Sequence, residues 1–227
     1  MWRLGMSHNS HDPRSLPRLL SEKAITAGNQ LAWFEQFYQL ALTRGYSIPW
    51  ADMKPNPNLM EIYDRIPVPK YSTKRLVVGC GLGDDAEWLA RKGHEVTAFD
   101  ISPSAIEECH KRFPTSSVRY VEADLLNPPG FWQNHFDIVV ESYTLQVLKG
   151  ALRKKAVMSI TGFVITNGLL VLISRGRDDY EPAGTMPWPL TRREVDVIPK
   201  LGFQELFFED YMDPSEEPPL RRFRACY

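Results

Sequence analysis

The sequence has few cysteines, no long apolar run and no excess of either charge. Its three cysteines, Cys80, Cys109 and Cys226, are widely spaced and form no C-x-x-C pair, so neither a disulfide framework nor a structural zinc site is indicated. No apolar run approaches the roughly 18 residues that a membrane-spanning helix needs. The start of the chain also lacks the apolar core of a signal peptide. We therefore expect a soluble protein of the reducing cytoplasm, with no membrane partner.

A global cationic field is missing too, because 27 basic residues against 28 acidic ones leave a formal net charge of -1. Such a field draws proteins to nucleic acids and to anionic membranes, so we expect no nucleic-acid partner. With 43% hydrophobic and 11% aromatic residues, the disordered and fibrous classes are excluded. The length of 227 residues indicates one domain with an appendage. We expect it to act as a monomer or a weak homodimer.

The sequence shows no metal-ligating pattern. His8 and His11 lie in an arm without a partner carboxylate, and His94, His110 and His135 are isolated along the chain. A structural or catalytic metal site needs three or four ligands that converge. We expect no metal ion and no histidine base.

The first part of the chain, residues 1–70, is expected to hold an arm, helices and a lid segment. Residues 1–18 show no sustained period and indicate a loose arm. Apolar residues from Leu19 to Leu42 recur at helical spacing with Gly28 as an interruption, which predicts one or two helices. Residues 46–58 are rich in proline and asparagine, which indicates a linker or a lid.

Residues 71–227 alternate short apolar runs with amphipathic stretches, which predicts a domain of strands and helices in turn. Ser102 is a predicted N-cap with Pro103 at the first helical position, and Thr191 with Glu194 forms a predicted capping box. Strands this apolar are covered on both faces. We expect an α/β fold with a seven-stranded, mostly parallel sheet, helices on both faces and an antiparallel last strand pair. The predicted strands are 75–79, 95–100, 117–123, 136–142, 169–174, 203–211 and 220–227, with an Asn167-Gly168 turn before the fifth of them.

The strongest signal is a glycine-rich turn between an apolar strand and a helix. Gly79, Gly81 and Gly83 let the backbone bend sharply and approach a ligand without a Cβ in the way. The next strand ends in Asp100, whose carboxylate can accept hydrogen bonds from both ribose hydroxyls of an adenosyl ligand. A tight turn without a ligand needs only the glycines, so the added acidic residue favours a bound adenosine.

Spacing and charge in this turn distinguish between adenosine ligands. A dinucleotide fingerprint, G-x-G-x-x-G, would have its third glycine at position 84, which is Asp84. Asp84 and Asp85 place two negative charges at the helix N-terminus, where they would repel the pyrophosphate that a dinucleotide seats there. Their role can also be that of helix caps. S-adenosylmethionine has no phosphate. We therefore expect S-adenosylmethionine rather than a nicotinamide dinucleotide as the cofactor.

With these motifs the sequence resembles the class I S-adenosylmethionine-dependent methyltransferases over residues 75–227, which implies a Rossmann-like sheet. In that family the glycine loop passes under the methionine part of the cofactor, and the acidic end of the second strand holds the ribose. The segment VEADLL matches the family's adenine contact, and FDIVVES matches the fourth strand beside the reactive end. The resemblance implies cofactor contacts by Gly79, Cys80, Gly81, Gly83, Asp100, Ile101, Asp124, Leu125, Glu141 and Ser142.

The preceding segment is similar to the opening of thiopurine methyltransferase-like and related small-molecule methyltransferases. The similarity lies in WFEQFYQ and in Ile48–Trp50, and in those enzymes such a segment covers the cofactor. It implies cofactor contacts by Trp33 and Trp50, because a sulfonium can be held against aromatic faces. A tryptophan at helical spacing is also a common core residue, so both interpretations of Trp33 stay open.

The expected activity is methyl transfer to a small-molecule acceptor by in-line displacement. The protein then mainly has to align and desolvate the reactants, and a base is needed only where the acceptor is protonated at neutral pH. Candidate catalytic residues are Glu141 first, Tyr143 second and Asp179 third. Alternatives are a protein of this fold that binds S-adenosylmethionine without transfer activity, and an NAD(P)-dependent oxidoreductase. The neutral charge disfavours a protein or RNA methyltransferase.

Overall fold

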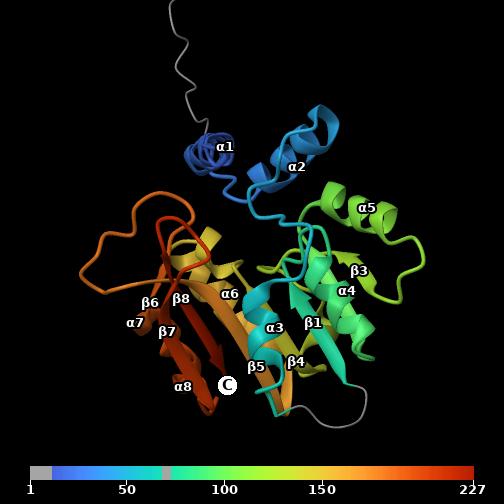
Figure 1. Cartoon of the computed structure of the whole chain (residues 1–227), viewed down its shortest axis with the longest axis vertical. Coiled ribbons are helices and arrows are strands. Elements are labelled where there is room, and N and C mark those ends of the chain that lie inside the picture. The colour runs from blue at the N-terminus through green and yellow to red at the C-terminus, as the bar shows by residue number, and fades with distance from the viewer. Residues whose placement is uncertain (1–11, 68–72) are drawn as a thin grey trace, which may run out of the picture. The chain divides into compact units, whose positions relative to one another are not determined.

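The computed structural model describes residues 12–67 and 73–227, and the chain divides into two compact units, Met1–Trp50 and Ala51–Tyr227 (Figure 1). Helix α3 (Pro57–Tyr63), which the sequence analysis assigns to the first part of the chain, lies in the second unit. The predicted boundary after residue 70 falls among residues 68–72, outside the described residues, and it stays a prediction.

The first unit contains helices α1 (Ser15–Thr26) and α2 (Ala32–Arg44). Gly28, with a φ of 75°, lies between them, which confirms the predicted interruption. Helix α1 starts earlier than expected, so the prediction of a loose arm is wrong for residues 15–18. The carboxylate of Asp12 accepts a hydrogen bond from the backbone N–H of Arg14 at 2.9 Å and so holds the chain at this helix start. The rest of the predicted arm, residues 1–11, lies outside the described residues.

Aromatic side chains form the core of the first unit. Trp33, Phe37 and Tyr38 on α2 are buried. The indole Nε1 of Trp50 donates to the Tyr38 hydroxyl at 2.9 Å, and the Trp50 ring meets that of Trp33 edge-on at a centroid distance of 6.1 Å. Trp33 is therefore a core residue of its own unit.

The second unit is built on one sheet. Its strands are β1 (Lys74–Val78), β2 (Glu95–Asp100), β3 (Arg119–Glu122), β4 (Phe136–Ser142), β5 (Val164–Arg177), β6 (Leu190–Thr191), β7 (Phe207–Asp213) and β8 (Leu220–Cys226). They follow the order β3-β2-β1-β4-β5-β8-β7, with β6 beside β5. Strands β1 to β6 pair in parallel, whereas β8 is antiparallel to β5 and β7. The predicted seven-stranded, mostly parallel sheet is thus confirmed, and the short β6 is an addition.

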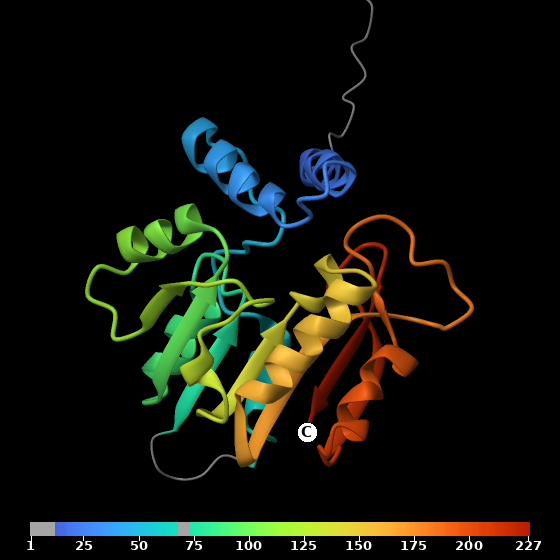
Figure 2. The same ribbon diagram turned by 180° about the vertical axis from the view of Figure 1, so that it is seen from behind.

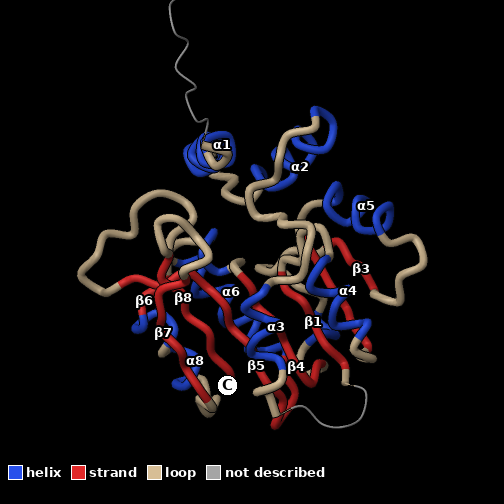
Figure 3. Tube along the Cα trace, viewed as in Figure 1, coloured by secondary structure: helices blue, strands red, loops and turns tan. Residues whose placement is uncertain are grey.

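Helices cover both faces of this sheet (Figures 1 and 2). On one face Leu59 of α3, Ala86 of α4 (Asp84–Arg91) and Ile106 of α5 (Pro103–Arg112) join sheet residues such as Val77 and Val140 in a buried cluster. Helix α6 (Ala151–Phe163) covers the other face, and Figure 3 shows the loops that gather at one end of the strands. The remaining short elements are α7 (Arg192–Val195), α8 (Val197–Lys200), η1 (Gly130–Trp132) and η2 (Leu145–Val147).

The predicted helix starts are found where the sequence places them. The Ser102 hydroxyl accepts from the N–H of Ala105 at 3.1 Å, with Pro103 next in the chain. Thr191 and Glu194 form the reciprocal capping box. The helix that follows is not continuous, because α7 ends at Val195 and α8 begins at Val197.

One predicted turn is part of a strand instead. Asn167-Gly168 was expected to separate helix α6 from the fifth strand, but β5 already begins at Val164 and runs through both residues. Asn167 has a φ of 63°, and the pairing of β5 with β4 shifts register at this point. Asparagine tolerates a left-handed backbone, and an irregularity of this kind lets a ladder continue beyond it.

Candidate active site at the carboxyl ends of the strands

Three strands end side by side at one edge of the sheet and define the candidate site. Strand β1 lies between β2 and β4, with Val78 opposite Phe99 on one side and Glu141 on the other. The residues that follow these positions, Gly79, Asp100 and Ser142, therefore share one edge. The connections from β1 and β4 run to opposite sides of the sheet, and in open α/β sheets ligands bind at such a switch point.

Two glycines of the loop, Gly79 and Gly83, have no room for a side chain. Gly79, Gly81 and Gly83 have φ values of 59°, 54° and 87°, in the left-handed region. A Cβ on Gly79 would collide with Oγ1 of Thr144, and a Cβ on Gly83 would collide with the Tyr120 hydroxyl at 2.5 Å. The loop therefore keeps bare backbone between β1 and α4, which is what close approach of a ligand to the main chain requires.

The Asp100 carboxylate ties this loop to the end of β2. Asp100 is 7% exposed. Its Oδ2 accepts from the N–H of Gly81 and its Oδ1 from the N–H of Ser102, each at 3.0 Å. The two residues that the sequence analysis singled out for the cofactor, Gly81 and Asp100, are thus brought into direct contact.

The two acidic residues at the start of α4 have different partners. The Arg112 guanidinium donates to both carboxylate oxygens of Asp84, at 2.9 and 2.8 Å. Asp85 accepts from the backbone N–H of Asn56 at 2.7 Å, and burial raises the pKa of Asp85 to about 6 although that hydrogen bond lowers it. The expectation of two uncompensated charges repelling a pyrophosphate is corrected accordingly, because Asp84 is neutralised by an ion pair.

Glu141 is fully buried beneath the turn that follows β4. Its Oε1 accepts from the N–H groups of Thr144 at 2.7 Å and Leu145 at 2.8 Å. Its Oε2 has no hydrogen-bond partner among the described residues. Burial raises the pKa of Glu141 to about 7, against the effect of the two backbone donors. A carboxylate held in this way caps the η2 turn. The catalytic role given to Glu141 stays a prediction, and this geometry favours a positioning role.

The next two residues, Ser142 and Tyr143, contact the start of α3, and Tyr143 also contacts strand β8. The Ser142 hydroxyl accepts from Nδ2 of Asn56 at 2.7 Å. Tyr143 has a φ of 64°, and its hydroxyl accepts from Nδ2 of Asn58 at 3.2 Å. The Arg222 guanidinium lies 5.1 Å from the Tyr143 ring centroid, and burial raises the pKa of Tyr143. Tyr143 is therefore held from two sides.

The sequence analysis missed Asn56 and Asn58, which it treated as part of a linker. Asn56 is the N-cap of α3, and its Oδ1 accepts from the N–H of Asn58 at 3.0 Å. The Tyr211 hydroxyl of β7 donates to Oδ1 of Asn58. The signal was available in Asn56-Pro57, because asparagine followed by proline is a typical helix start.

The other predicted site residues are placed as follows. Asp124 follows β3, and its Oδ1 accepts from the N–H of Leu126 at 2.7 Å, while Leu125 is buried and Ile101 half-buried. Asp179 is exposed in the loop between β5 and β6. The contacts of these residues with a ligand stay predictions. The cofactor contacts of Trp33 and Trp50, which would join the two units, also stay predictions.

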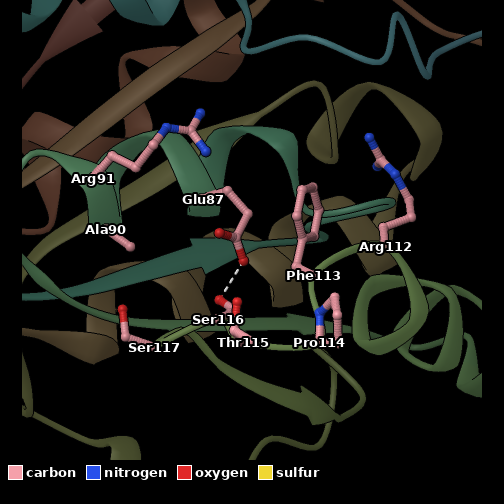
Figure 4. Close-up of a pocket in the computed structure, with 9 residues that line it drawn as sticks. All are labelled: Glu87, Ala90, Arg91, Arg112, Phe113, Pro114, Thr115, Ser116 and Ser117. Carbon is pink, nitrogen blue, oxygen red and sulfur yellow. Dashed lines mark hydrogen bonds between the residues drawn. The ribbon is translucent and has the colours of Figure 1, made fainter.

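A separate surface hollow of about 370 Å³ lies between α4 and residues 113–117 (Figure 4). Its central carboxylate, Glu87, accepts from the hydroxyls of Ser116 and Tyr120. Arg112 at its rim is the partner of Asp84. The hollow holds none of the predicted site residues, and its central polar groups already have partners.

In the described ranges no cluster of three or more His, Cys, Asp or Glu side chains suits a metal ion. None of the helices described there has the length and apolarity to cross a membrane.

Comparison with known proteins agrees with this geometry. Residues 76–172 match a family model described as a methyltransferase domain. The structure of the N-methyltransferase NodS from Bradyrhizobium japonicum in complex with S-adenosyl-L-homocysteine superposes with a TM-score of 0.61 and 22% identity, over 84% of this chain and 97% of that chain. The 1,6-didemethyltoxoflavin-N1-methyltransferase of Burkholderia thailandensis, solved with its substrate and S-adenosylhomocysteine, gives 0.60 and 15%, over 100% and 91%.

The fold is also found outside methyl transfer. The cyclase SpnF superposes with a TM-score of 0.62 at 14% identity, over 74% of this chain and 78% of that chain. Fold alone therefore leaves the reaction open, and the sequence match of residues 76–172 to the methyltransferase domain decides between S-adenosylmethionine and a nicotinamide dinucleotide. The matched domain, the Rossmann-like sheet and the glycine loop together support a methyltransferase that uses S-adenosylmethionine.

Proposed function

We propose that the chain transfers the methyl group of S-adenosylmethionine to a small-molecule acceptor. The observation that carries the proposal is the meeting of Gly81 and Asp100 at the edge where β1, β2 and β4 end. The small acceptor is supported by the near-neutral charge of the chain and by the full-length match to an enzyme solved with a small substrate. Free cysteines fit a cytoplasmic enzyme, acting as a monomer or a weak homodimer.

Some residues at this edge would bind the cofactor, and another would contact the acceptor. S-adenosylmethionine, when bound, supplies a methyl group on a positively charged sulfur. The bare backbone at Gly79 to Gly83 would lie against its methionine part, and Asp100 would accept from its ribose. Tyr143 would orient the acceptor. Its hydroxyl oxygen already accepts a hydrogen bond from Asn58, so the hydroxyl proton is directed away from Asn58. Alignment of this kind lowers a barrier by roughly 7 to 11 kcal/mol.

The test is formation of S-adenosylhomocysteine over a panel of acceptors. The panel should include aromatic thiols, heterocyclic nitrogens, primary amines, phenols and carboxylates, with Asp100→Asn as the control that loses cofactor affinity. Turnover with one acceptor class and none with RNA or protein supports the proposal. Preference for an aromatic thiol would support the thiopurine methyltransferase-like branch. Turnover confined to a macromolecule would refute the small acceptor.

A second candidate function is considered because the cyclase SpnF shows that this fold also occurs outside methyl transfer. In that case the chain would bind S-adenosylmethionine and catalyse no transfer. Calorimetry separates the two possibilities, because this alternative predicts cofactor binding with no S-adenosylhomocysteine formed from any acceptor in the panel.

A further inference from the structure

Asn56 uses all of its polar groups to join three elements. Its backbone N–H donates to Asp85 of α4 at 2.7 Å, and its backbone carbonyl accepts from Met60 of α3 at 3.1 Å. Its side-chain Oδ1 accepts from the N–H of Asn58 at 3.0 Å, and its Nδ2 donates to the Ser142 hydroxyl at 2.7 Å. The residue therefore links the start of α3 to the glycine-loop helix and to the end of β4.

The orientation of the Asn56 amide follows from its partners. A backbone N–H can only donate, so the side-chain atom facing the N–H of Asn58 must be the oxygen. The atom facing Ser142 is then the NH₂ group. A hydroxyl has one proton and can accept through its lone pairs. Ser142 accepts from Asn56, so its own proton is directed away from Asn56.

Helix capping alone does not require asparagine at this position. Aspartate and serine cap helices about as well, because only a side-chain oxygen is needed. The feature that asparagine adds is the donor toward Ser142. Ser142 is half-buried and ends β4 at the edge where the cofactor is expected.

We infer that Asn56 is a positioning residue for the methyl-transfer site: it ties the start of α3 to the end of β4 and turns the Ser142 hydroxyl into a hydrogen-bond donor toward the bound cofactor. This inference rests on the cofactor assignment. It is independent of the acceptor, so it can be tested by binding alone.

Asn56→Asp tests the direction of the hydrogen bond. The carboxylate keeps the helix cap and the backbone bond to Asp85, but it can only accept, so the Ser142 proton is turned toward it. Affinity for S-adenosylhomocysteine, measured by calorimetry, is expected to fall about three- to tenfold, the size of one neutral hydrogen bond. The melting temperature without ligand is measured beside it, because the new carboxylate lies close to that of Asp85, and Asn56→Ser serves as the variant without added charge.

Asn56→Ser and Ser142→Ala complete the experiment. Each removes the Asn56–Ser142 bond without adding a charge, and we expect a similar loss of affinity that is not additive in the double variant. Ser159→Ala is the matched control, because it deletes a hydroxyl that bonds only to Lys155 O of its own helix, at 3.2 Å.

Two outcomes would overturn the inference. Wild-type affinity for S-adenosylhomocysteine in both Asn56→Asp and Asn56→Ser would refute the positioning role while leaving the cofactor intact. Failure of the wild-type protein itself to bind S-adenosylhomocysteine would refute the cofactor assignment, and the role of Asn56 with it.

Discussion

Replacing Gly79 by alanine tests whether Thr144 leaves no room for a side chain at this position of the glycine loop. Gly79 has a φ of 59°, and a left-handed backbone costs an alanine about 1–2 kcal/mol. The new Cβ would also collide with Oγ1 of Thr144, and overpacking of this kind costs about 1–3 kcal/mol. We expect the free energy of unfolding in urea to fall by about 2–5 kcal/mol, together with loss of S-adenosylhomocysteine binding.

Gly93→Ala is the matched control for Gly79→Ala. Gly93 has a φ of 90°, but a Cβ there would meet nothing within 4 Å. This variant should lose only the backbone contribution, about 1–2 kcal/mol, and keep its affinity for S-adenosylhomocysteine. Adding Thr144→Ala to Gly79→Ala should recover part of the loss, although Thr144 gives up its bond to Val78 O, 3.1 Å long. Equal destabilisation by Gly79→Ala and Gly93→Ala would refute the steric argument.

Three further predictions concern charged side chains. The pKa of Asp85 is raised from 3.8 to about 6 in the folded protein, so the folded state holds the proton more tightly than the unfolded state. The free energy of unfolding should therefore fall as pH rises between these values. Urea unfolding of Asp85→Asn over the same pH range should show no such fall. Glu141→Gln keeps an acceptor for the two turn amides, so turnover should be retained, whereas a loss of about a hundredfold or more would identify a general base. Arg112→Gln should cost about 1–3 kcal/mol in thermal or urea unfolding, because both side chains of its pair with Asp84 are largely buried. The control Lys111→Gln should cost less than about 0.5 kcal/mol, because the Lys111 side chain is 67% exposed.

Local signals in the sequence identified most of the second unit. Strand runs such as 136–142, the Ser102 cap and the Thr191–Glu194 capping box depend on short-range chemistry, which a sequence displays directly. The antiparallel end of the sheet followed from the missing helix between the last two strands. The Asn167 irregularity was not predicted, because an Asn-Gly pair indicates a turn whether or not a neighbouring strand continues the ladder through it.

The sequence brought candidate site residues together only where backbone conformation or a strand end dictates their position. Gly81 and Asp100 meet as expected, since a glycine turn and the end of a parallel strand must share one edge. The partner of Asp84 was not foreseeable, because Arg112 approaches it through tertiary packing. The turn amides that bind Glu141 are local, since Thr144 and Leu145 lie three and four residues further along the chain. The helix cap at Asn56 could be recognised from the sequence, but its hydrogen bond to Ser142 could not. That bond joins residues far apart in the chain.

Strand β7 ends the sheet among the described residues, and an end strand offers its backbone to any passing polypeptide. Glu209, Asp210 and Asp213 of this strand are each paired with arginine, to Arg65, Arg221 and Arg222 respectively. A second chain that paired with β7 would have to desolvate these ion pairs. These charged side chains thus disfavour the addition of a further strand at this edge of the sheet.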